Sequence, residues 1–293
     1  MTFYRKCVRY FIKSLCKGEI WYVKSALRRK LYLPMMYFGR PYLRNLDIHV
    51  TDHCNLNCKG CSLISPLAKE WFCDVEQTEK DLSELSKKVQ ILNLSLIGGE
   101  PLLHPEITEL VRVVRKAYPK SDITVVTNGS LLPKMTDDFW KVCRENRVVF
   151  MLSVYPPLRT HLNEYLKLSK GNGIHVMLLH NTRAWDRMRF SFKTEENMAG
   201  IHYRLCKQKD CYKLVDSKLY LCPLFSLKHY NRYFNENHPT IKGYDIYKYS
   251  GKELVQFMKR PDPACRYCTW VVKNETTQWG YSKREKSEWC EDV

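Results

Sequence analysis

Short apolar runs rich in β-branched residues alternate along the middle of the chain with segments whose apolar residues recur at helical spacing. The runs lie at 46–50, 91–97, 123–126, 148–154 and 174–179. The segments between them predict four helices, marked by Leu82 to Val89, Ile107 to Val114, Phe139 to Cys143 and Leu162 to Leu168. Strands and helices alternating at this spacing are typical of a buried parallel sheet. We therefore expect an α/β fold whose sheet closes into a barrel or part of one.

The pattern changes at both ends of the chain. Residues 1–45 carry two apolar stripes, interrupted at Gly18, that predict two amphipathic helices. After residue 200 the rhythm is lost, and the chain becomes irregular and rich in Cys and Tyr. We therefore divide the chain into N-terminal helices (1–45), an α/β core (46–200) and a small C-terminal domain (201–293).

Charge adds one feature to this division. The chain of 293 residues has a net charge of +17, and residues 1–45 supply +10 of it through eleven Lys and Arg against Glu19. The N-terminal helices therefore either cap the core with their apolar faces or contact a membrane surface or another anionic partner. The charge also suggests a nucleic-acid-binding protein, but no RNA-binding motif is visible, so nucleic acid is the weaker choice.

Cysteine usage bears on the compartment. The thirteen cysteines are odd in number, and no signal-peptide pattern precedes them. We expect a reducing cytoplasm, with peripheral contact at the inner membrane face as an option. No uncharged run reaches the ~20 residues needed to cross a bilayer.

Three of the cysteines follow the first predicted strand directly. Cys54, Cys58 and Cys61 stand in C-x3-C-x2-C spacing within "TDHCNLNCKGC". Catalytic groups of parallel barrels lie at this end of the strands. Three thiolates leave one coordination position open for a substrate or cofactor, whereas a structural zinc site needs a fourth ligand, for which His53 is the alternative.

The second predicted strand ends in "LIGGEPLLHPE". Gly98 and Gly99 allow the backbone to approach a ligand closely. Glu100, at the same mouth as the cysteines, can accept hydrogen bonds from an ammonium group.

Together these motifs resemble those of the radical S-adenosylmethionine (radical SAM) superfamily, over residues 46–200. The resemblance implies a partial (β/α)6 TIM-like barrel and a [4Fe-4S] cluster on Cys54, Cys58 and Cys61, with S-adenosylmethionine on the fourth iron. It also implies that Glu100, with the backbone of Gly98 and Gly99, holds the methionyl ammonium, and that Ser153 faces the ribose or carboxylate on a rim shared with Asn128. Gly60 departs from the family, which usually has an aromatic residue there, so no adenine contact is assigned.

The C-terminal region contains a second cysteine set. The segment "LVDSKLYLC" alternates like a hairpin with a tight Asp-Ser turn, and Cys265-Arg-Tyr-Cys268 follows it. This arrangement resembles the auxiliary-cluster ("twitch", a truncated SPASM) domain of the superfamily, with Ser217 where Gly is usual. It implies a second [4Fe-4S] cluster whose expected ligands are Cys206, Cys222, Cys265 and Cys268. Two alternatives stay open: Cys211 could replace Cys206 as a ligand, and the site could hold a structural zinc.

The resemblance implies reductive cleavage of S-adenosylmethionine to a 5'-deoxyadenosyl radical, which removes a hydrogen atom from a substrate, with flavodoxin or ferredoxin as electron donor. The stretch "CNLNCKGCSLISPLA" also resembles a subgroup found among bacterial surface-polysaccharide functions. We expect oxidation or epimerisation of a small sugar-like or lipid-linked substrate. Cys211 and Cys290 are the candidate hydrogen-atom donors. The alternatives are a peptide-modifying maturase and, in another class, an RNA-binding or RNA-modifying protein.

Overall fold

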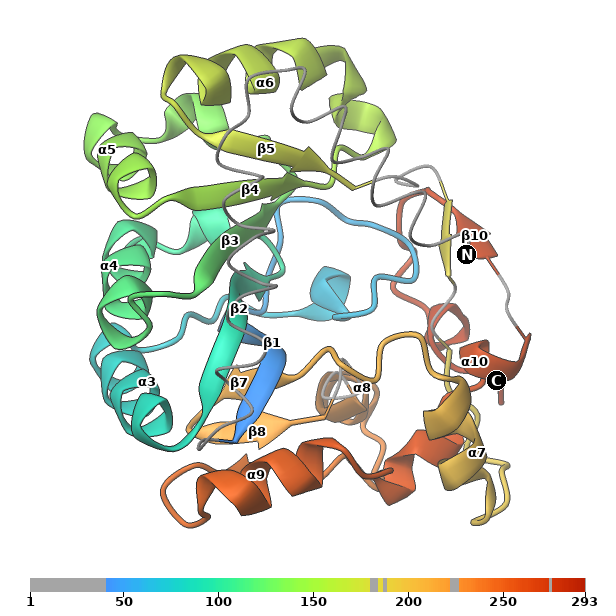
Figure 1. The fold of residues 1–293 in the computed structure, drawn as a ribbon. Coiled ribbons are helices and arrows are strands. Elements are labelled where there is room, and N and C mark those ends of the chain that lie inside the picture. Colours follow the sequence, from blue (N-terminus) through green and yellow to red (C-terminus); the bar gives the residue numbers. More distant parts are fainter. Residues whose placement is uncertain (1–40, 180–183, 187–188, 222–226, 274–275, 293) are drawn as a thin grey trace, which may run out of the picture.

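A twisted sheet of eight strands forms the centre of the molecule (Figure 1). The computed structural model describes residues 41–179, 184–186, 189–221, 227–273 and 276–292. The strand order is β5-β4-β3-β2-β1-β7-β8-β9; β1 to β5 and β7 pair in parallel, whereas β8 pairs antiparallel with both of its neighbours, β7 and β9. The strands are β1 (Tyr42–Thr51), β2 (Gln90–Gly98), β3 (Asp122–Thr127), β4 (Val148–Leu152), β5 (His175–Leu178), β7 (Lys213–Val215), β8 (Lys218–Tyr220) and β9 (Tyr244–Asp245). The expected α/β class with a mostly parallel sheet is confirmed.

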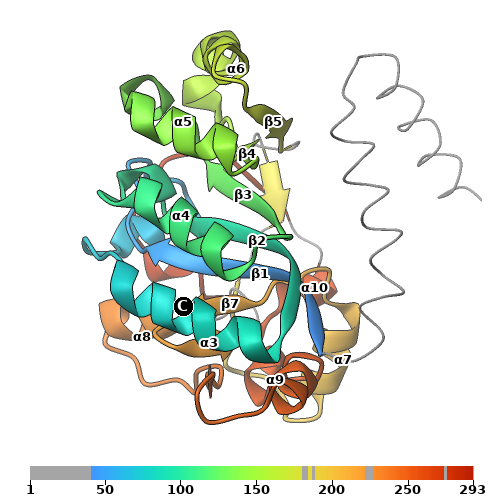
Figure 2. The same ribbon diagram turned by 60° about the vertical axis from the view of Figure 1, so that its left-hand side comes forward.

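The four predicted helices connect the parallel strands and are confirmed at the predicted positions. Two of them begin with a side-chain cap: Asp74 accepts from the backbone N–H of Gln77, and Thr136 from that of Phe139. Figure 2 shows α3, α4 and α5 along one face of the sheet. The helices are α3 (Val75–Lys88), α4 (Ile107–Ala117), α5 (Asp137–Glu145) and α6 (Leu162–Gly171).

Strand β1 has two chemically different faces because successive side chains of a strand point to opposite sides. Leu46, Ile48 and Val50 are at most 2% exposed and belong to the apolar core. Asp47 and His49, which alternate with them, point to the opposite, inner face of the sheet. The inner face therefore carries polar groups close to the cysteine loop.

The predicted hairpin is confirmed and extends the sheet. Asp216 and Ser217, between β7 and β8, have φ values of 47° and 59°, as a type I′ turn requires. Strand β7 lies beside β1, with Asp47 opposite Lys213. Residues predicted to form a separate C-terminal domain thus supply the sixth parallel strand, on the far side of β1 from β2.

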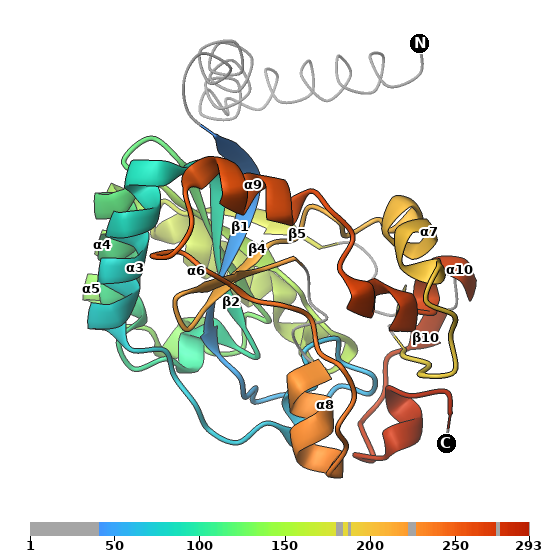
Figure 3. The same cartoon turned by 90° about the horizontal axis from the view of Figure 1, so that it is seen from below.

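The rest of the chain gathers at one side of the molecule. Figure 3 shows α7, α10 and β10 on the side away from α3, α4 and α5. The predicted N-terminal helices, with the basic residues of 1–40, lie outside the described residues. Among the described helices, none is long and apolar enough to cross a membrane. The remaining elements are β6 (Ala184–Asp186), paired antiparallel with β10 (Thr276–Gln278), and the helices α7 (Met198–Leu205), α8 (Leu227–Phe234), α9 (Gly251–Met258) and α10 (Trp270–Lys273).

Candidate active site

The cysteine loop follows β1 and brings three free thiols to one end of the sheet. Cys54, Cys58 and Cys61 form no disulfide. Burial, together with the charges of Glu100 and the neighbouring cysteines, raises the pKa of Cys54, and burial raises the pKa of Cys58 to about 11. Such thiols ionise when a metal centre supplies the compensating positive charge.

The ligand chemistry of this loop fits an iron-sulfur cluster. In the described ranges, no three His, Cys, Asp or Glu side chains are arranged to hold a single metal ion. A [4Fe-4S] cluster requires no such convergence, because each cysteine binds a different iron. Two of the sulfurs also accept N–H hydrogen bonds, from the backbone of Leu56 to Cys54 at 3.4 Å and from the Trp279 indole to Cys58 at 3.3 Å. Hydrogen bonds to the sulfurs are a usual feature of cluster sites.

Glu100 lies beneath this loop and joins the ends of two strands. Its side chain is 1% exposed, and burial raises its pKa to about 7. Oε1 accepts from the Thr127 hydroxyl at 2.6 Å and from the Leu102 N–H at 3.1 Å, and Oε2 accepts from the Asn128 N–H at 2.8 Å. The carboxyl group therefore fixes the end of β2 against the end of β3.

Gly98 and Gly99 are explained first by contact between two backbone segments. A Cβ atom on Gly98 would lie 2.2 Å from the carbonyl oxygen of Thr51, and one on Gly99 would lie 2.0 Å from that of His53. The N–H of Gly99 donates to Thr51 O at 2.8 Å. The two glycines thus let the start of the cysteine loop rest directly on the end of β2, in addition to the expected approach to a ligand.

Asn128 and Ser153 lie on the same rim. The Asn128 amide donates to Asn55 Oδ1 at 2.9 Å and faces Cys54 Sγ at 3.9 Å. Ser153 is 8% exposed, and its N–H donates to Thr127 O. The structure thus brings together the residues assigned to S-adenosylmethionine and the three cysteines, while their individual roles stay predictions.

Tyr155 is a rim residue that the sequence analysis missed. Burial and the nearby charges of the cysteines and Glu100 raise the pKa of its hydroxyl. Its position two residues after Ser153 in "LSVYP" was an available signal, because side chains two apart in an extended segment share a face.

The second cysteine set is described in part. Cys206 ends α7, while Cys265 and Cys268 lie in and after the 3-10 helix Pro263–Tyr267 and are 6% and 7% exposed. Burial raises the pKa of Cys265 to about 11, and the His202 ring of α7 contacts Cys265 O at 3.1 Å, so the helix that ends at Cys206 packs against the segment that carries Cys265. Cys222 lies outside the described residues.

The two candidate hydrogen-atom donors occupy different surroundings. Cys211 is near Asp47, Lys213 and Cys206, and burial raises its pKa to about 11. Cys290 is 2% exposed in the apolar core, where its sulfur accepts from the Asp292 N–H at 3.4 Å. Cys211 therefore lies at the polar inner face, whereas Cys290 is packed beside the C-terminus.

A polar cluster on the inner face was also missed. His49, 2% exposed, and His229 contact the two oxygens of Asp52 at 2.6 and 3.3 Å. Burial lowers the pKa of His49 to about 4, so its ring is neutral at pH 7. Lys213, 1% exposed, lies near Asp47. Burial raises the pKa of Asp47, and the lysine charge opposes this rise only in part. The polar alternation in "LDIHVT" was the sequence signal for this cluster.

The C-terminal residues 276–292, here called the C-terminal strap, lie along the cysteine loop. The N–H of Lys59 donates to Gly280 O at 2.8 Å, and the N–H of Gly60 donates to Glu288 Oε2 at 3.0 Å. The indole of Trp289, fully buried, donates to Cys61 O at 2.9 Å. These partners are more than 220 residues apart in sequence, as the separation of 228 for Gly60 and Glu288 shows, so no local pattern signalled them.

Comparison with known proteins shows that the part of the chain carrying this site is similar to a known family. The profile of the radical SAM superfamily matches residues 48–175. The GTP 3',8-cyclase of Chlorobaculum tepidum is 41% identical over 103 residues, which are 34% of this chain and 30% of that protein. A probable GTP 3',8-cyclase of Pyrococcus abyssi is 33% identical over 101 residues, or 34% of this chain and 32% of that protein. The chain therefore spans about a third of the length of the curated relatives it matches.

Solved structures include similar chains of low identity. BtrN in complex with AdoMet and 2-DOIA is 14% identical, with a TM-score of 0.48, and the match covers 86% of this chain and 99% of that one. SuiB of Streptococcus suis is 21% identical, with a TM-score of 0.38, and the match covers 47% of this chain and 32% of that one.

Proposed function

From the premise that this chain contains a radical SAM domain, we propose that it is an enzyme that removes a hydrogen atom from a small, sugar-like substrate. The substrate radical would then lose a second electron to an auxiliary cluster and a proton, giving oxidation, or would take up a hydrogen atom from the thiol of Cys211 or Cys290, giving epimerisation. Cys54, Cys58 and Cys61 would hold the [4Fe-4S] cluster. Once reduced, that cluster would supply the electron that cleaves bound S-adenosylmethionine to methionine and the 5'-deoxyadenosyl radical. Glu100 would accept a hydrogen bond from the methionyl ammonium, since Oε2 has one donor among the described residues and a carboxylate oxygen can accept two.

The observation that supports a sugar-like substrate best is the polar pair on β1 and β7, in which Lys213 is buried and Asp47 is partly buried. Lys213 is 1% exposed and donates only, whereas Asp47 in its ionised form accepts only. A hydroxyl group can accept from the first and donate to the second. A substrate rich in hydroxyl groups would therefore offer both side chains further hydrogen bonds, beyond the one between Asp47 and Ser95, whereas an apolar chain would offer them none.

A nucleotide is the second candidate substrate, because the curated relatives are named GTP 3',8-cyclase. Lys213 could then contact a phosphate group instead of a hydroxyl. A peptide and a lipid-linked sugar remain outcomes that the same experiment would recognise.

The test is transfer of deuterium from the substrate to 5'-deoxyadenosine. Protein reduced with dithionite is incubated with S-adenosylmethionine and, in separate reactions, with carbon-deuterated sugar nucleotides, lipid-linked sugars, GTP and peptides. We expect deuterated 5'-deoxyadenosine with a sugar compound and only slow, unlabelled product without substrate. Label arriving from GTP or from a peptide would replace the sugar proposal by that substrate class.

Lys213→Met should lower the substrate-stimulated rate at least tenfold while leaving the slow, substrate-free cleavage unchanged. The reason is that the buried ammonium would be a donor to substrate and is not among the charges that act on Cys54 or Cys58. Lys218→Met, at an exposed position of the same hairpin, is the matched control. Equal loss in both variants would assign the effect to the hairpin and not to substrate contact.

We also propose a second [4Fe-4S] cluster on Cys206, Cys222, Cys265 and Cys268, supported by the contact between α7, which ends at Cys206, and Cys265. Cys206→Ala should remove about four irons per chain, because it takes away one of the four thiolates proposed to hold this cluster. Cys211→Ala should retain them. Iron, sulfide and zinc analysis of anaerobically purified protein decides: iron loss in Cys211→Ala alone would exchange the two assignments, and zinc in place of iron would make the site structural.

A further inference from the structure

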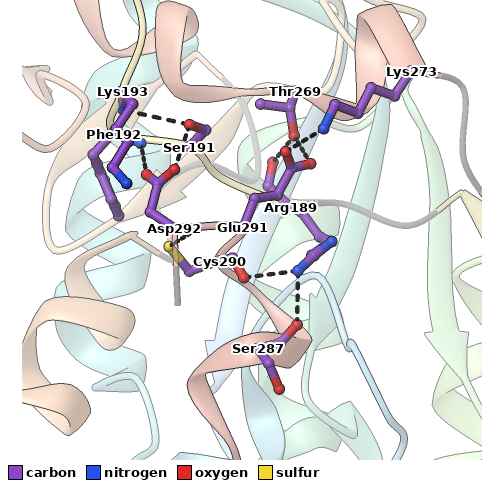
Figure 4. Close-up of polar contacts among 10 residues, drawn as sticks. All are labelled: Arg189, Ser191, Phe192, Lys193, Thr269, Lys273, Ser287, Cys290, Glu291 and Asp292. Atoms are coloured by element: carbon purple, nitrogen blue, oxygen red, sulfur yellow. Dashed lines mark hydrogen bonds and ion pairs between the residues drawn. The ribbon is translucent and has the colours of Figure 1, made fainter.

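The C-terminal strap is fixed at its far end by side chains from two other segments. Figure 4 shows residues 287–292 between residues 189–193 and 269–273. The donor–acceptor distances are 2.5 to 3.2 Å. These bonds join Arg189 to the carbonyl oxygens of Ser287 and Cys290, Thr269 and Lys273 to Glu291, and Ser191 to Asp292.

Residues 280–282 of the strap pair with the cysteine loop in antiparallel register. The N–H of Ser282 donates to Asn57 O at 2.9 Å, and Tyr281 forms a bridge with Cys58. The bonds run between main-chain atoms, so the register depends little on side-chain motion. This register places the indole of Trp279 beside the sulfur of Cys58, with Nε1 3.3 Å from Sγ.

Trp279 differs from the other side-chain donors around the loop. The indole of Trp289 donates to a carbonyl oxygen and not to a sulfur. The Asn128 amide faces Cys54 Sγ at 3.9 Å and has a nearer acceptor in Asn55 at 2.9 Å. Among the side chains that the structure describes around this loop, the Trp279 indole has the shortest hydrogen bond to a cysteine sulfur.

We propose that Trp279 is a positioning residue that raises the reduction potential of the cluster bound through Cys58. This inference rests on the proposed function, because it requires the cluster on the three cysteines. A hydrogen bond to a ligand sulfur stabilises the reduced cluster more than the oxidised one, since reduction adds negative charge. The strap would thus tune the reduction potential of the cluster through Trp279, a residue outside the C-x3-C-x2-C motif.

The first test is a redox titration of the anaerobically purified full chain. The readout is the electron paramagnetic resonance signal that changes when S-adenosylmethionine is added. That choice separates this cluster from an auxiliary one. Trp279→Phe keeps an aromatic ring but removes the N–H. We expect unchanged iron content and a tenfold shift of the reduction equilibrium toward the oxidised cluster, which is 59 mV lower for one electron.

Tyr281→Phe is the matched control, because Tyr281 is 65% exposed and forms its bridge to Cys58 through the main chain. Its potential should equal that of the unmodified protein. An unchanged potential in Trp279→Phe at full iron content overturns the proposal, and so does an equal shift in both variants.

A second measurement needs no substitution and decides the matter if Trp279→Phe fails to fold. Protein grown with indole-15N tryptophan is reduced, and pulsed electron paramagnetic resonance measures coupling between that nitrogen and the cluster. We expect a resolved 15N coupling, and its absence overturns the proposal. Absence of iron and of any cluster signal in the unmodified protein would instead refute the proposed function.

Discussion

Replacing Cys54, Cys58 and Cys61 together by alanine is expected to remove about four irons per chain and to abolish formation of 5'-deoxyadenosine. The three thiols form no disulfide, and they are the three cysteines of this loop, so the triple variant leaves the loop without a thiol ligand. The unmodified protein should be brown and carry about eight irons. Iron and sulfide analysis, with chromatographic detection of 5'-deoxyadenosine, measures both effects.

Cys143→Ala is the control for this experiment. Cys143 is fully buried on α5, away from the loop, and burial alone raises its pKa. Its removal should leave iron and activity intact and cost only packing energy. A colourless, zinc-loaded protein would refute both the cluster assignment and the proposed reaction.

Glu100→Gln is expected to destabilise the protein by ~1–3 kcal/mol and to weaken S-adenosylmethionine binding. The carboxylate accepts hydrogen bonds through both oxygens, from Leu102 N–H and Asn128 N–H among others. A glutamine amide must turn its NH2 group toward one of these donors, in either orientation. One buried backbone N–H therefore loses its acceptor, and the methionyl ammonium loses a charged one.

Thermal unfolding and calorimetric titration measure the two effects, with the exposed Glu106→Gln as control. The pH dependence adds a second readout. Burial raises the pKa of Glu100 from 4.5 to about 7, so the folded protein holds this proton more tightly than the unfolded chain. The contribution of Glu100 to stability is complete below pH 4.5 and is lost as the pH rises through 7. Glu100→Gln should remove that part of the pH dependence, and an unaltered profile would contradict the assignment.

The features predicted correctly from sequence are those determined by nearby residues. The strand β2 was predicted at 91–97 and observed at Gln90–Gly98, because its apolar pattern is sufficient to identify it. The hairpin turn at Asp216 and Ser217 was likewise determined by four residues and a local backbone preference. The cysteine spacing predicted a metal loop for the same reason.

The features that were missed depend on residues far apart in the sequence. The inner polar face needs Asp47 and Lys213 on adjacent strands, and nothing in either segment indicates that β7 lies beside β1. The bond between Gly60 and Glu288 joins residues 228 apart. Hydrophobic periodicity carries no information about such pairings, so the arrangement of the strap and of the second cysteine set could not be derived from it.

The position of β1 in the middle of the sheet has a consequence for folding during synthesis. One neighbour of β1 is β2, which follows within fifty residues, but the other is β7, at residues 213–215. The main-chain partners of the cysteine loop are synthesised later still, since they are residues 280–282. Pairings of such separation form late and slowly. The nascent chain therefore exposes one edge of β1 and an incomplete metal-binding loop until nearly all of this sequence has been translated, and cluster insertion is expected to follow translation.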